Sequence, residues 1–232
     1  KILGKGYFDF PKPTSLIERL ISITCNHNDI ILDFFSGSST TADAIFKFNL
    51  KTGNQLNFIL VQVPETIDTN STAYKDGFKN ICEIGEERIR RSGIEIKKLS
   101  NSKSIDVGFR VFKLSSSNTE NLIDVPKNYN RRDIGKLINL LKHDRSSEDL
   151  LIQVMLELGI ELSSKIKEVI IDDIKTWIVD DGYLVAITSD KCSESAVTHL
   201  AKIKPSFAVF RNDAGTTDQM LSNIEQITLR LI

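Results

Sequence analysis

Apolar residues along the first sixty positions change from helical to strand-like spacing. Residues 16–21 carry four aliphatic side chains at helical spacing, and Ser15-x-x-Glu18 has the form of a capping box. Two short apolar runs, 30–35 and 57–63, are bounded by polar turn residues and Pro64. Both runs predict buried strands.

Helices are predicted between and after these strands. Thr40-x-x-Asp43 is expected to cap a helix, and a further helical stripe over 78–89 is expected to end at Gly93. Residues 108–114 predict another strand. Because strands and helices alternate, the pattern predicts βαβ units with a parallel sheet, and the fold class is α/β.

A polar, turn-rich segment at 115–130 is the best candidate for a linker between two domains. We expect a first domain over 1–114 and a second, small α/β domain over 131–232. Its expected elements are helices over 134–141 and 150–158, the second ended by Gly159, strands over 176–179 and 183–188 joined by a hairpin turn at 180–182, a helix over 193–203, a strand over 207–210 and a helix over 218–229.

The composition is that of an ordinary globular protein. The 232 residues are 41% hydrophobic and 26% charged, and 30 basic against 31 acidic residues give a net charge of −1. This balance excludes a polybasic nucleic-acid coat for the chain as a whole. We find no apolar run long enough to cross a membrane, and the residues at the start of the given sequence do not show a signal-peptide pattern. The chain starts at Lys1 rather than Met, so we expect it to be a piece of a longer protein.

The cysteines give no indication of a disulfide framework or a zinc site. Cys25, Cys82 and Cys192 are scattered, and no C-x-x-C pair or Cys/His cluster occurs. A reducing, cytoplasmic setting therefore fits best.

The turn between the first predicted strand and the next helix carries the most informative residues. Ser36-Gly37-Ser38-Ser39 lets a ligand approach the backbone, and the N–H groups of the following helix favour an anionic group. The turn is neither a phosphate P-loop nor a G-x-G-x-x-G motif. Taken alone, it supports a ligand site and a simple tight turn about equally.

Polar residues follow the second predicted strand. Gln62 and Glu65 lie 25 and 28 residues after Gly37. This is close to the spacing at which nucleotide-binding folds place a residue that bonds the ribose hydroxyls. A solvated turn explains the same residues.

Several segments together resemble a known family. Asp33–Thr41 resembles motif I, the cofactor loop, of amino-methylating DNA methyltransferases, and Phe8–Ile17 resembles their motif X in the order of the β class. Further segments resemble the methylation (Mod) subunits of type III restriction–modification systems: Gln62–Glu65, Glu87–Arg91, Gly108–Leu114, Leu150–Leu158 and Phe210–Asp213.

This resemblance implies a partial Rossmann-like sheet that binds S-adenosyl-L-methionine. Gln62 is the first choice for the ribose hydroxyls and Glu65 the second. The second glycine of motif I is Ser39 here, which is costly if that position needs a positive φ. The remaining residues that the resemblance places at the cofactor are Lys12 and Pro13 beside its methionine end and Asp33, Phe35, Gly37, Ser38 and Thr40 in the loop around that end.

The family's catalytic tetrapeptide, Asp/Asn-Pro-Pro-Tyr/Phe, does not occur in the chain. The nearest sequence, Lys204–Phe207, lacks the acceptor and the second proline, and we expect it to be structural. In the β class the catalytic motif and the target-recognition domain precede motif X, so we expect them upstream of Lys1. We expect no catalytic residue and no metal site within these residues.

The resemblance therefore implies the C-terminal portion of a site-specific DNA methyltransferase that methylates adenine N6 in a prokaryotic restriction–modification system. The implied partners are DNA, mainly through the missing part, a second copy of the subunit, and a helicase/nuclease restriction subunit. One alternative is a non-catalytic module that pairs subunits through 131–232. Another is a nucleotide-binding oxidoreductase, which the missing third glycine disfavours.

Other charged residues have simpler interpretations. The histidines, His27, His143 and His199, are expected at the surface or as caps. The pairs Asp172-Asp173 and Asp180-Asp181 suit turns. The basic groups that could touch phosphates are better explained as solvated helix faces; they are Arg88, Arg90 and Arg91, and Lys127, Arg131 and Arg132.

Overall fold

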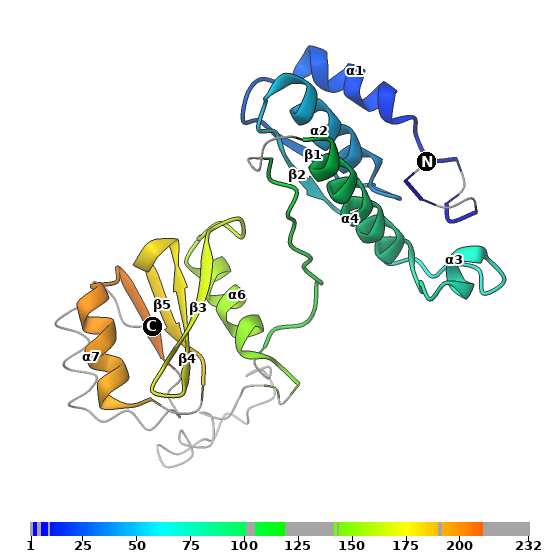
Figure 1. Cartoon of the computed structure of the whole chain (residues 1–232). Coiled ribbons are helices and arrows are strands. Elements are labelled where there is room, and N and C mark those ends of the chain that lie inside the picture. Colours follow the sequence, from blue (N-terminus) through cyan, green and yellow to red (C-terminus); the bar gives the residue numbers. More distant parts are fainter. Residues whose placement is uncertain are drawn as a thin grey trace, which may run out of the picture. The chain divides into compact units, whose positions relative to one another are not determined.

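A computed structural model describes residues 2–3, 6–8, 10–100, 105–118, 142, 144–189 and 192–210 (Figure 1). The chain forms two compact units, Lys1–Phe112 and Lys113–Ile232, and both mix helices with a sheet. Several predicted features lie outside the described residues: most of the linker, the helices over 134–141 and 218–229, the segment 211–213, His143, Lys127, Arg131 and Arg132.

The first unit is built on a βαβ arrangement, as the alternation of strand and helix predicts. Strand β1 pairs with strand β2 in parallel, with Ile30 opposite Asn57 and Asp33 opposite Leu60. The connection between them runs through a helix, α2, which begins at Thr40 as predicted. The elements are α1 (Thr14–Thr24), β1 (Ile30–Asp33), α2 (Thr40–Thr52) and β2 (Asn57–Leu60).

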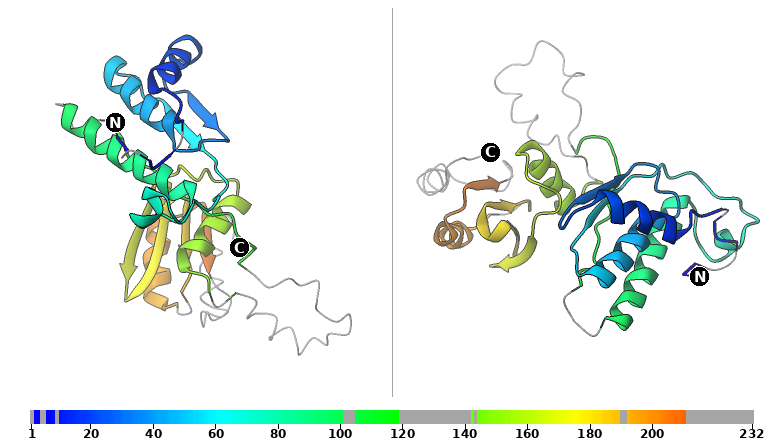
Figure 2. Two further views of the ribbon diagram at one scale, coloured as in Figure 1. Left: turned by 90° about the vertical axis from the view of Figure 1, so that its right-hand side faces the viewer. Right: turned by 90° about the horizontal axis from the view of Figure 1, so that it is seen from above.

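Two further helices lie in the described part of this unit. The short α3 (Thr72–Lys75) is followed by the long α4 (Ile81–Leu99), and α2 lies between α1 and α4 (Figure 2). The core lies between these helices and the inner face of the strands. Its buried apolar side chains are Ile21, Ala42, Ala44, Ile45, Phe46, Leu56, Ile84, Ile89 and Ile96.

The prediction that these strands are buried is wrong for one face of the sheet. Ile31 and Phe58 pack on the helices, whereas Ile30 and Leu32 are 63% and 58% exposed. The helices cover one side of the strand pair, so alternate side chains point away from them. Both strands are also shorter than predicted, because β1 ends at Asp33 and β2 ends at Leu60.

Several boundary predictions are also wrong. Ser15 lies inside α1, whose N-cap is Pro13, and no side chain caps that helix. Gly93 does not end α4, because the helix continues to Leu99. A side chain at Gly93 would approach Val107 within 3.1 Å, so this glycine serves close packing instead. Residues 108–114 form no strand.

The described residues of the second unit form a four-stranded sheet in the order β3-β4-β5-β6. The first two pairings are antiparallel, and β6 joins β5 in parallel through helix α7. The predicted hairpin turn, helix and last strand are confirmed, whereas β3 was not predicted. The elements are α6 (Ser147–Glu157), β3 (Ile166–Ile171), β4 (Ile174–Val179), η3 (Asp180–Gly182), β5 (Leu184–Ile187), α7 (Glu194–Ile203) and β6 (Phe207–Phe210).

Helices cover both faces of this sheet. Val185 and Ile187 of β5 pack toward Leu200 of α7, whereas Leu184 and Ala186 pack toward Met155 of α6. All four residues of β5 are therefore buried. Gly159 follows the end of α6 with a φ of 69°, as expected for the residue after a helix end.

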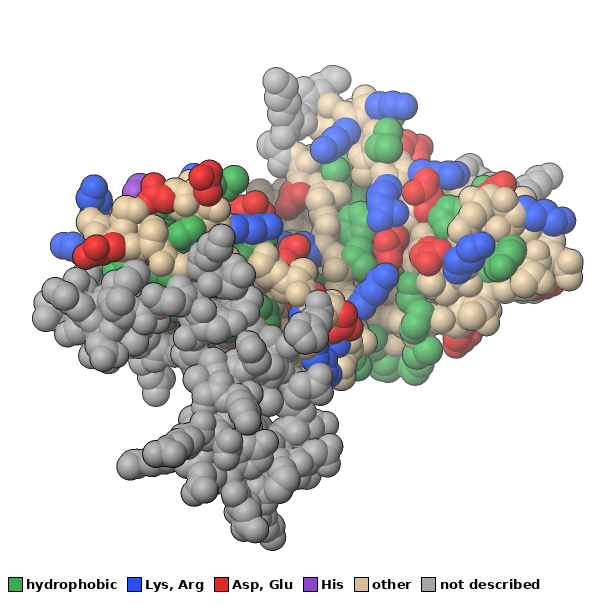
Figure 3. Space-filling model, turned by 90° about the horizontal axis from the view of Figure 1, so that it is seen from below, with side chains coloured by type: hydrophobic (Ala, Val, Ile, Leu, Met, Phe, Trp, Pro, Cys, Tyr) green, Lys and Arg blue, Asp and Glu red, His purple; other side chains and the backbone are tan. Residues whose placement is uncertain are grey.

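The aspartate pairs occupy turns, as predicted. Asp172, Asp173, Asp180 and Asp181 all have positive φ, which Asp tolerates better than most residues. Among the described helices, none is long and apolar enough to cross a membrane. On the face shown in Figure 3, basic and acidic side chains are interspersed, in keeping with the near-neutral net charge.

Candidate functional site

The turn after β1 has an unusual backbone that several hydrogen bonds fix. Gly37 and Ser39 both have positive φ, 50° and 57°. The N–H of Ser36 donates to the carbonyl of Val61 at 3.2 Å, and the N–H of Ser39 donates to the carbonyl of Ser36 at 2.8 Å. The position of the missing second glycine thus does require the left-handed conformation, and Ser39 adopts it at a cost.

Asp33 connects the end of β1 to the start of α2. Its Oδ2 accepts a hydrogen bond from the Thr41 hydroxyl at 2.5 Å, and its Oδ1 accepts from the N–H of Phe35 at 3.2 Å. Phe35 itself is 80% exposed. Asp33 therefore orients both sides of the turn.

Gln62 joins the turn from the end of β2. Its Oε1 accepts from the N–H of Gly37 at 2.8 Å, and its Nε2 donates to the carbonyl of Val63 at 3.1 Å. Glu65 is exposed, and its backbone pairs with Val63 and Ile81. The structure thus places the Gln62 side chain at Gly37, whereas the backbone of Glu65 pairs with other residues.

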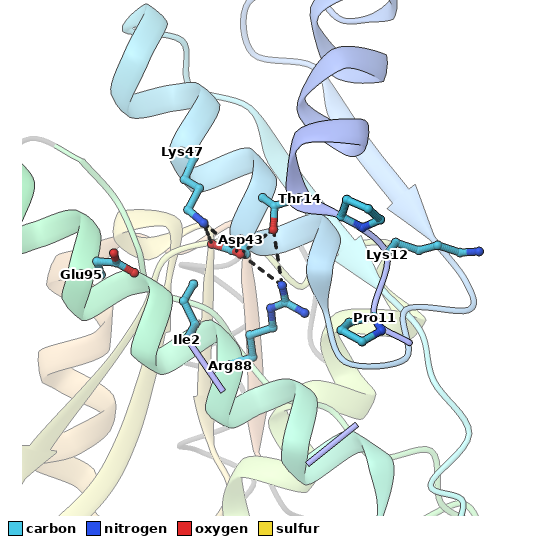
Figure 4. Close-up of a pocket in the computed structure, with 9 residues that line it drawn as sticks. Ile2, Pro11, Lys12, Thr14, Asp43, Lys47, Arg88 and Glu95 are labelled. Atoms are coloured by element: carbon cyan, nitrogen blue, oxygen red, sulfur yellow. Dashed lines mark hydrogen bonds and ion pairs between the residues drawn. The ribbon is translucent and has the colours of Figure 1, made fainter. Parts of the chain in front are cut away.

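The upstream segment reaches the turn through Phe8. A Cβ atom added to Gly37 would lie 3.1 Å from Cζ of Phe8, so the glycine allows the ring to pack on the turn. The predicted neighbours Lys12 and Pro13 lie beside Arg88, which donates to the turn residues Ser38 and Thr40. Lys12 and Pro13 line a hollow of about 540 Å³, and the lining, among the described residues, does not include Gly37 or Gln62 (Figure 4).

A buried ion pair lies behind the turn. Arg88 of α4 is 8% exposed and Asp43 of α2 is 1% exposed, and Nη2 of the arginine lies 3.3 Å from Oδ2 of the aspartate. The arginine also donates to the hydroxyls of Ser38 and Thr40. The prediction that Arg88 lies on a solvated helix face is therefore wrong, because this one basic residue of the run faces the core.

The electrostatics of Asp43 follow from its partners. Burial raises the pKa of its carboxyl, but hydrogen bonds from Lys47 and Ser92 outweigh burial and hold the pKa below the ordinary value of 3.8. Lys47 lies 3.0 Å from Oδ1 and Ser92 donates to the same oxygen at 2.8 Å. Asp43 is therefore ionised at neutral pH and does not act as the helix cap that the sequence predicts.

Sequence reasoning missed the roles of Phe8, Thr14, Asp43 and Arg88. A usable signal was present for the arginine. Gly85, Arg88 and Ser92 recur at helical spacing on the face of α4 that carries buried residues. A basic residue on a buried stripe indicates a partner in the core.

Other candidate sites are not supported by the geometry. Arg90 is exposed and Arg91 is half-buried, and both have charged partners one turn away on the same helix, Glu86 and Glu87. Within the described part of the chain, acidic, histidine and cysteine side chains form no cluster that could hold a metal ion.

Comparisons with known proteins show a family similarity over most of the first unit. Residues 2–97, which include the turn and most of α4, match the DNA methylase family. The chain is similar to the Mod subunit of the type III restriction-modification enzyme StyLTI from Salmonella typhimurium, with 34% identity over 124 residues, which are 53% of this chain and 19% of that protein.

Two more relatives show the same pattern. The EcoPI Mod subunit of Escherichia phage P1 is 38% identical over 113 residues, covering 47% of this chain and 17% of that protein. The type II methyltransferase M.KpnI of Klebsiella pneumoniae is 37% identical over 89 residues, covering 38% and 21%. The chain thus spans about a fifth of the length of these relatives. The resemblance to type III methylation subunits is confirmed.

Proposed function

We propose that this chain, related to the DNA methylases over residues 2–97, is the cofactor-binding part of a longer DNA methyltransferase. In this proposal the longer protein transfers a methyl group from S-adenosyl-L-methionine to adenine N6 within a type III restriction–modification system. The observation that carries the proposal is the fixed turn at Gly37, because it lies inside the matched region and has the geometry of a ligand loop.

The residues present fit the chemistry of the cofactor. S-adenosyl-L-methionine offers a carboxylate, an ammonium group and ribose hydroxyls. The helix after the turn, α2, has no side-chain cap at Ser39, so its first N–H groups suit a carboxylate. Gln62 already lies on the turn and supplies an amide for the ribose, with Glu65 as the second choice.

The remaining assignments follow from what each side chain already contacts. The hydroxyls of Ser38 and Thr40 face Arg88, so these residues would contribute backbone N–H groups. Asp33 would hold the turn and exposed Phe35 would lie at its rim. The remaining proposed ligands are Lys12 and Pro13, which approach from the start of α1.

The bound cofactor would supply an electrophilic methyl group. The acceptor tetrapeptide does not occur in these residues, so residues outside them would position the adenine. We infer that the βαβ arrangement belongs to a Rossmann-like sheet within 1–114. We also propose that the small α/β domain over 131–232 contributes to dimerisation, and that the longer protein associates with DNA and a restriction subunit.

Calorimetric titration of the chain with S-adenosyl-L-methionine tests the proposal. We expect binding that Gly37→Asp abolishes, because the new side chain would meet Phe8 and strain a positive φ. Gly53→Asp is the matched control, since Gly53 also has a positive φ but no atom within 4 Å of an added Cβ. A folded chain that binds nothing at millimolar cofactor would overturn the proposal and favour the assembly module.

A further inference from the structure

We propose that Arg88 is a positioning residue for the turn at 36–41, which it holds in one conformation through the hydroxyls of Ser38 and Thr40. The inference rests on the proposed function, because the conformation that is held is the one offered to the cofactor. Arg88 would act through the turn and would not itself touch the cofactor.

The guanidinium contacts two segments that are distant from it in sequence, the start of α1 and the stretch 38–43. Nη1 donates to Oγ of Ser38 at 3.1 Å and to Oγ1 of Thr40 at 2.8 Å. Nη2 donates to Oγ1 of Thr14 at 3.4 Å and to Oδ2 of Asp43 at 3.3 Å. One side chain on α4 therefore fixes the turn, the start of α1 and the first turn of α2 together. Figure 4 shows the bonds of Arg88 to Thr14 and Asp43.

The charge of Arg88 has a defined partner beside Nη2, which leaves Nη1 to donate to the turn. Asp43 faces Arg88 and Lys47, and it accepts further hydrogen bonds from Ser92 and Thr14. A buried cation without such a partner would be strongly destabilising. The ion pair thus anchors the guanidinium, and the neutral hydroxyls of the turn bind to an anchored group.

The turn needs stabilising contacts from other elements because its own backbone is strained. Ser39 lies in the left-handed region, where a residue with a Cβ is stable only if its surroundings determine it. Gly85, one turn of α4 before Arg88, provides the space. A Cβ atom there would lie 2.6 Å from Oγ of Ser39 and 3.2 Å from the carbonyl oxygen of Gly37. The face of α4 that packs against the turn at Gly85 therefore also binds it through Arg88.

Lysine cannot replace arginine in this role. The guanidinium is planar with its donors in a fixed fork, whereas a lysine ammonium is a single point charge. Arg88→Lys keeps a cation opposite Asp43 but cannot reach acceptors on both sides. Arg90→Lys is the matched control, because Arg90 lies on the same helix with a half-exposed side chain and partners at Glu86 and Glu87.

Hydrogen exchange of the whole chain without cofactor tests directly whether Arg88 stabilises the turn. The reporters are the N–H groups of Ser36, Gly37 and Ser39, which belong to the turn. They donate hydrogen bonds to Val61, to Gln62 and to Ser36, respectively. We expect Arg88→Lys to accelerate their exchange by about tenfold or more, the size of one lost hydrogen bond to a charged group. Exchange in β1 should change little, and Arg90→Lys should leave the turn as it is.

A second variant keeps the test decisive if Arg88→Lys fails to fold. Thr40→Val removes the 2.8 Å acceptor and leaves the ion pair with Asp43 intact. It should accelerate exchange at the same N–H groups. Unchanged turn exchange in a folded Arg88→Lys chain, or in Thr40→Val where Arg88→Lys does not fold, would overturn the proposal.

Cofactor titration separates this inference from the proposed function. If the wild-type chain binds S-adenosyl-L-methionine, Arg88→Lys should weaken the affinity about tenfold at temperatures where both chains are folded. If exchange of the turn is faster in Arg88→Lys but the wild-type chain binds no cofactor, the positioning role of Arg88 stands and the proposed ligand is wrong. If Arg88→Lys binds the cofactor with wild-type affinity, the contacts of Arg88 with the turn do not contribute to binding.

Discussion

The backbone N–H of Gly37 donates to Oε1 of Gln62 at 2.8 Å, across 25 residues of sequence. The end of β2 therefore determines the conformation of the turn that follows β1. Two residues that sequence analysis assigned separately, one to a loop and one to a ribose contact, form one unit in the folded chain.

Replacing Gln62 by Ala should weaken both the turn and the cofactor site. The Gly37 N–H loses its acceptor, which should lower the free energy of unfolding by about 1 kcal/mol. Urea unfolding and calorimetry with S-adenosyl-L-methionine measure the two effects. Glu65→Ala is the control, and a larger loss of affinity in Glu65→Ala than in Gln62→Ala would assign the ribose to Glu65.

Ser39→Gly should stabilise the chain. Glycine adopts a φ of 57° without the steric cost that a Cβ brings, and we expect a gain of about 0.5–1 kcal/mol in urea unfolding. Ser39→Ala removes the hydroxyl but keeps the Cβ, so it should give no gain. Equal stability of the two variants would show that the backbone at this position is not strained.

Gly85→Ala should destabilise the chain although alanine favours helices. The added Cβ would lie 2.6 Å from Oγ of Ser39, and such overpacking typically costs about 1–3 kcal/mol. Combining Gly85→Ala with Ser39→Gly removes that hydroxyl and should restore more than half of the loss. Gly93→Ala approaches a valine side chain at 3.1 Å instead and should be insensitive to Ser39→Gly.

Asp43 should make the free energy of unfolding of the first unit depend on pH in the acidic range. Because its folded pKa is below 3.8, ionised Asp43 contributes fully above the unfolded pKa. This contribution is lost as the pH falls below about 4 and through the folded value. Asp43→Asn should cost about 3 kcal/mol at neutral pH, since it leaves Arg88 without its buried partner.

Urea unfolding at several pH values between roughly 3 and 6 measures this dependence. The free energy of unfolding should fall more steeply with acidification in the wild type than in Asp43→Asn. Asp68→Asn, which changes an exposed carboxylate in the same unit, should keep the wild-type slope. A wild-type slope in Asp43→Asn would contradict the assigned role.

Much of the first unit could be predicted from periodicity and turn chemistry. The apolar runs near 31 and 58 and the helix from Thr40 indicate a βαβ arrangement, and the small residues around Gly37 indicate a special turn. The sequence predicts that serine at position 39 is costly if a positive φ is needed there, and Ser39 has a φ of 57°. These features depend on local sequence.

The features that sequence could not predict depend on packing between distant elements. Arg88 reads as one cation in a basic run, and only the fold shows that it faces the core with Asp43. The exposure of Ile30 and Leu32 has the same origin, since an apolar run does not specify how many layers cover a strand. The β3 strand was missed because Lys167 and Glu168 interrupt its alternation.

The way in which each sheet is connected has a consequence for how the chain folds. Strand β3 turns into β4 through Asp172 and Asp173 alone, so Ile171 meets Ile174 after a minimal loop closure. Ile30 pairs with Asn57 only after the longer connection that contains α2 has folded, because α2 lies between the two strands in sequence. Parallel pairing of this kind forms slowly compared with a hairpin. In refolding, protection of the β3–β4 amides should therefore precede that of β1 and β2.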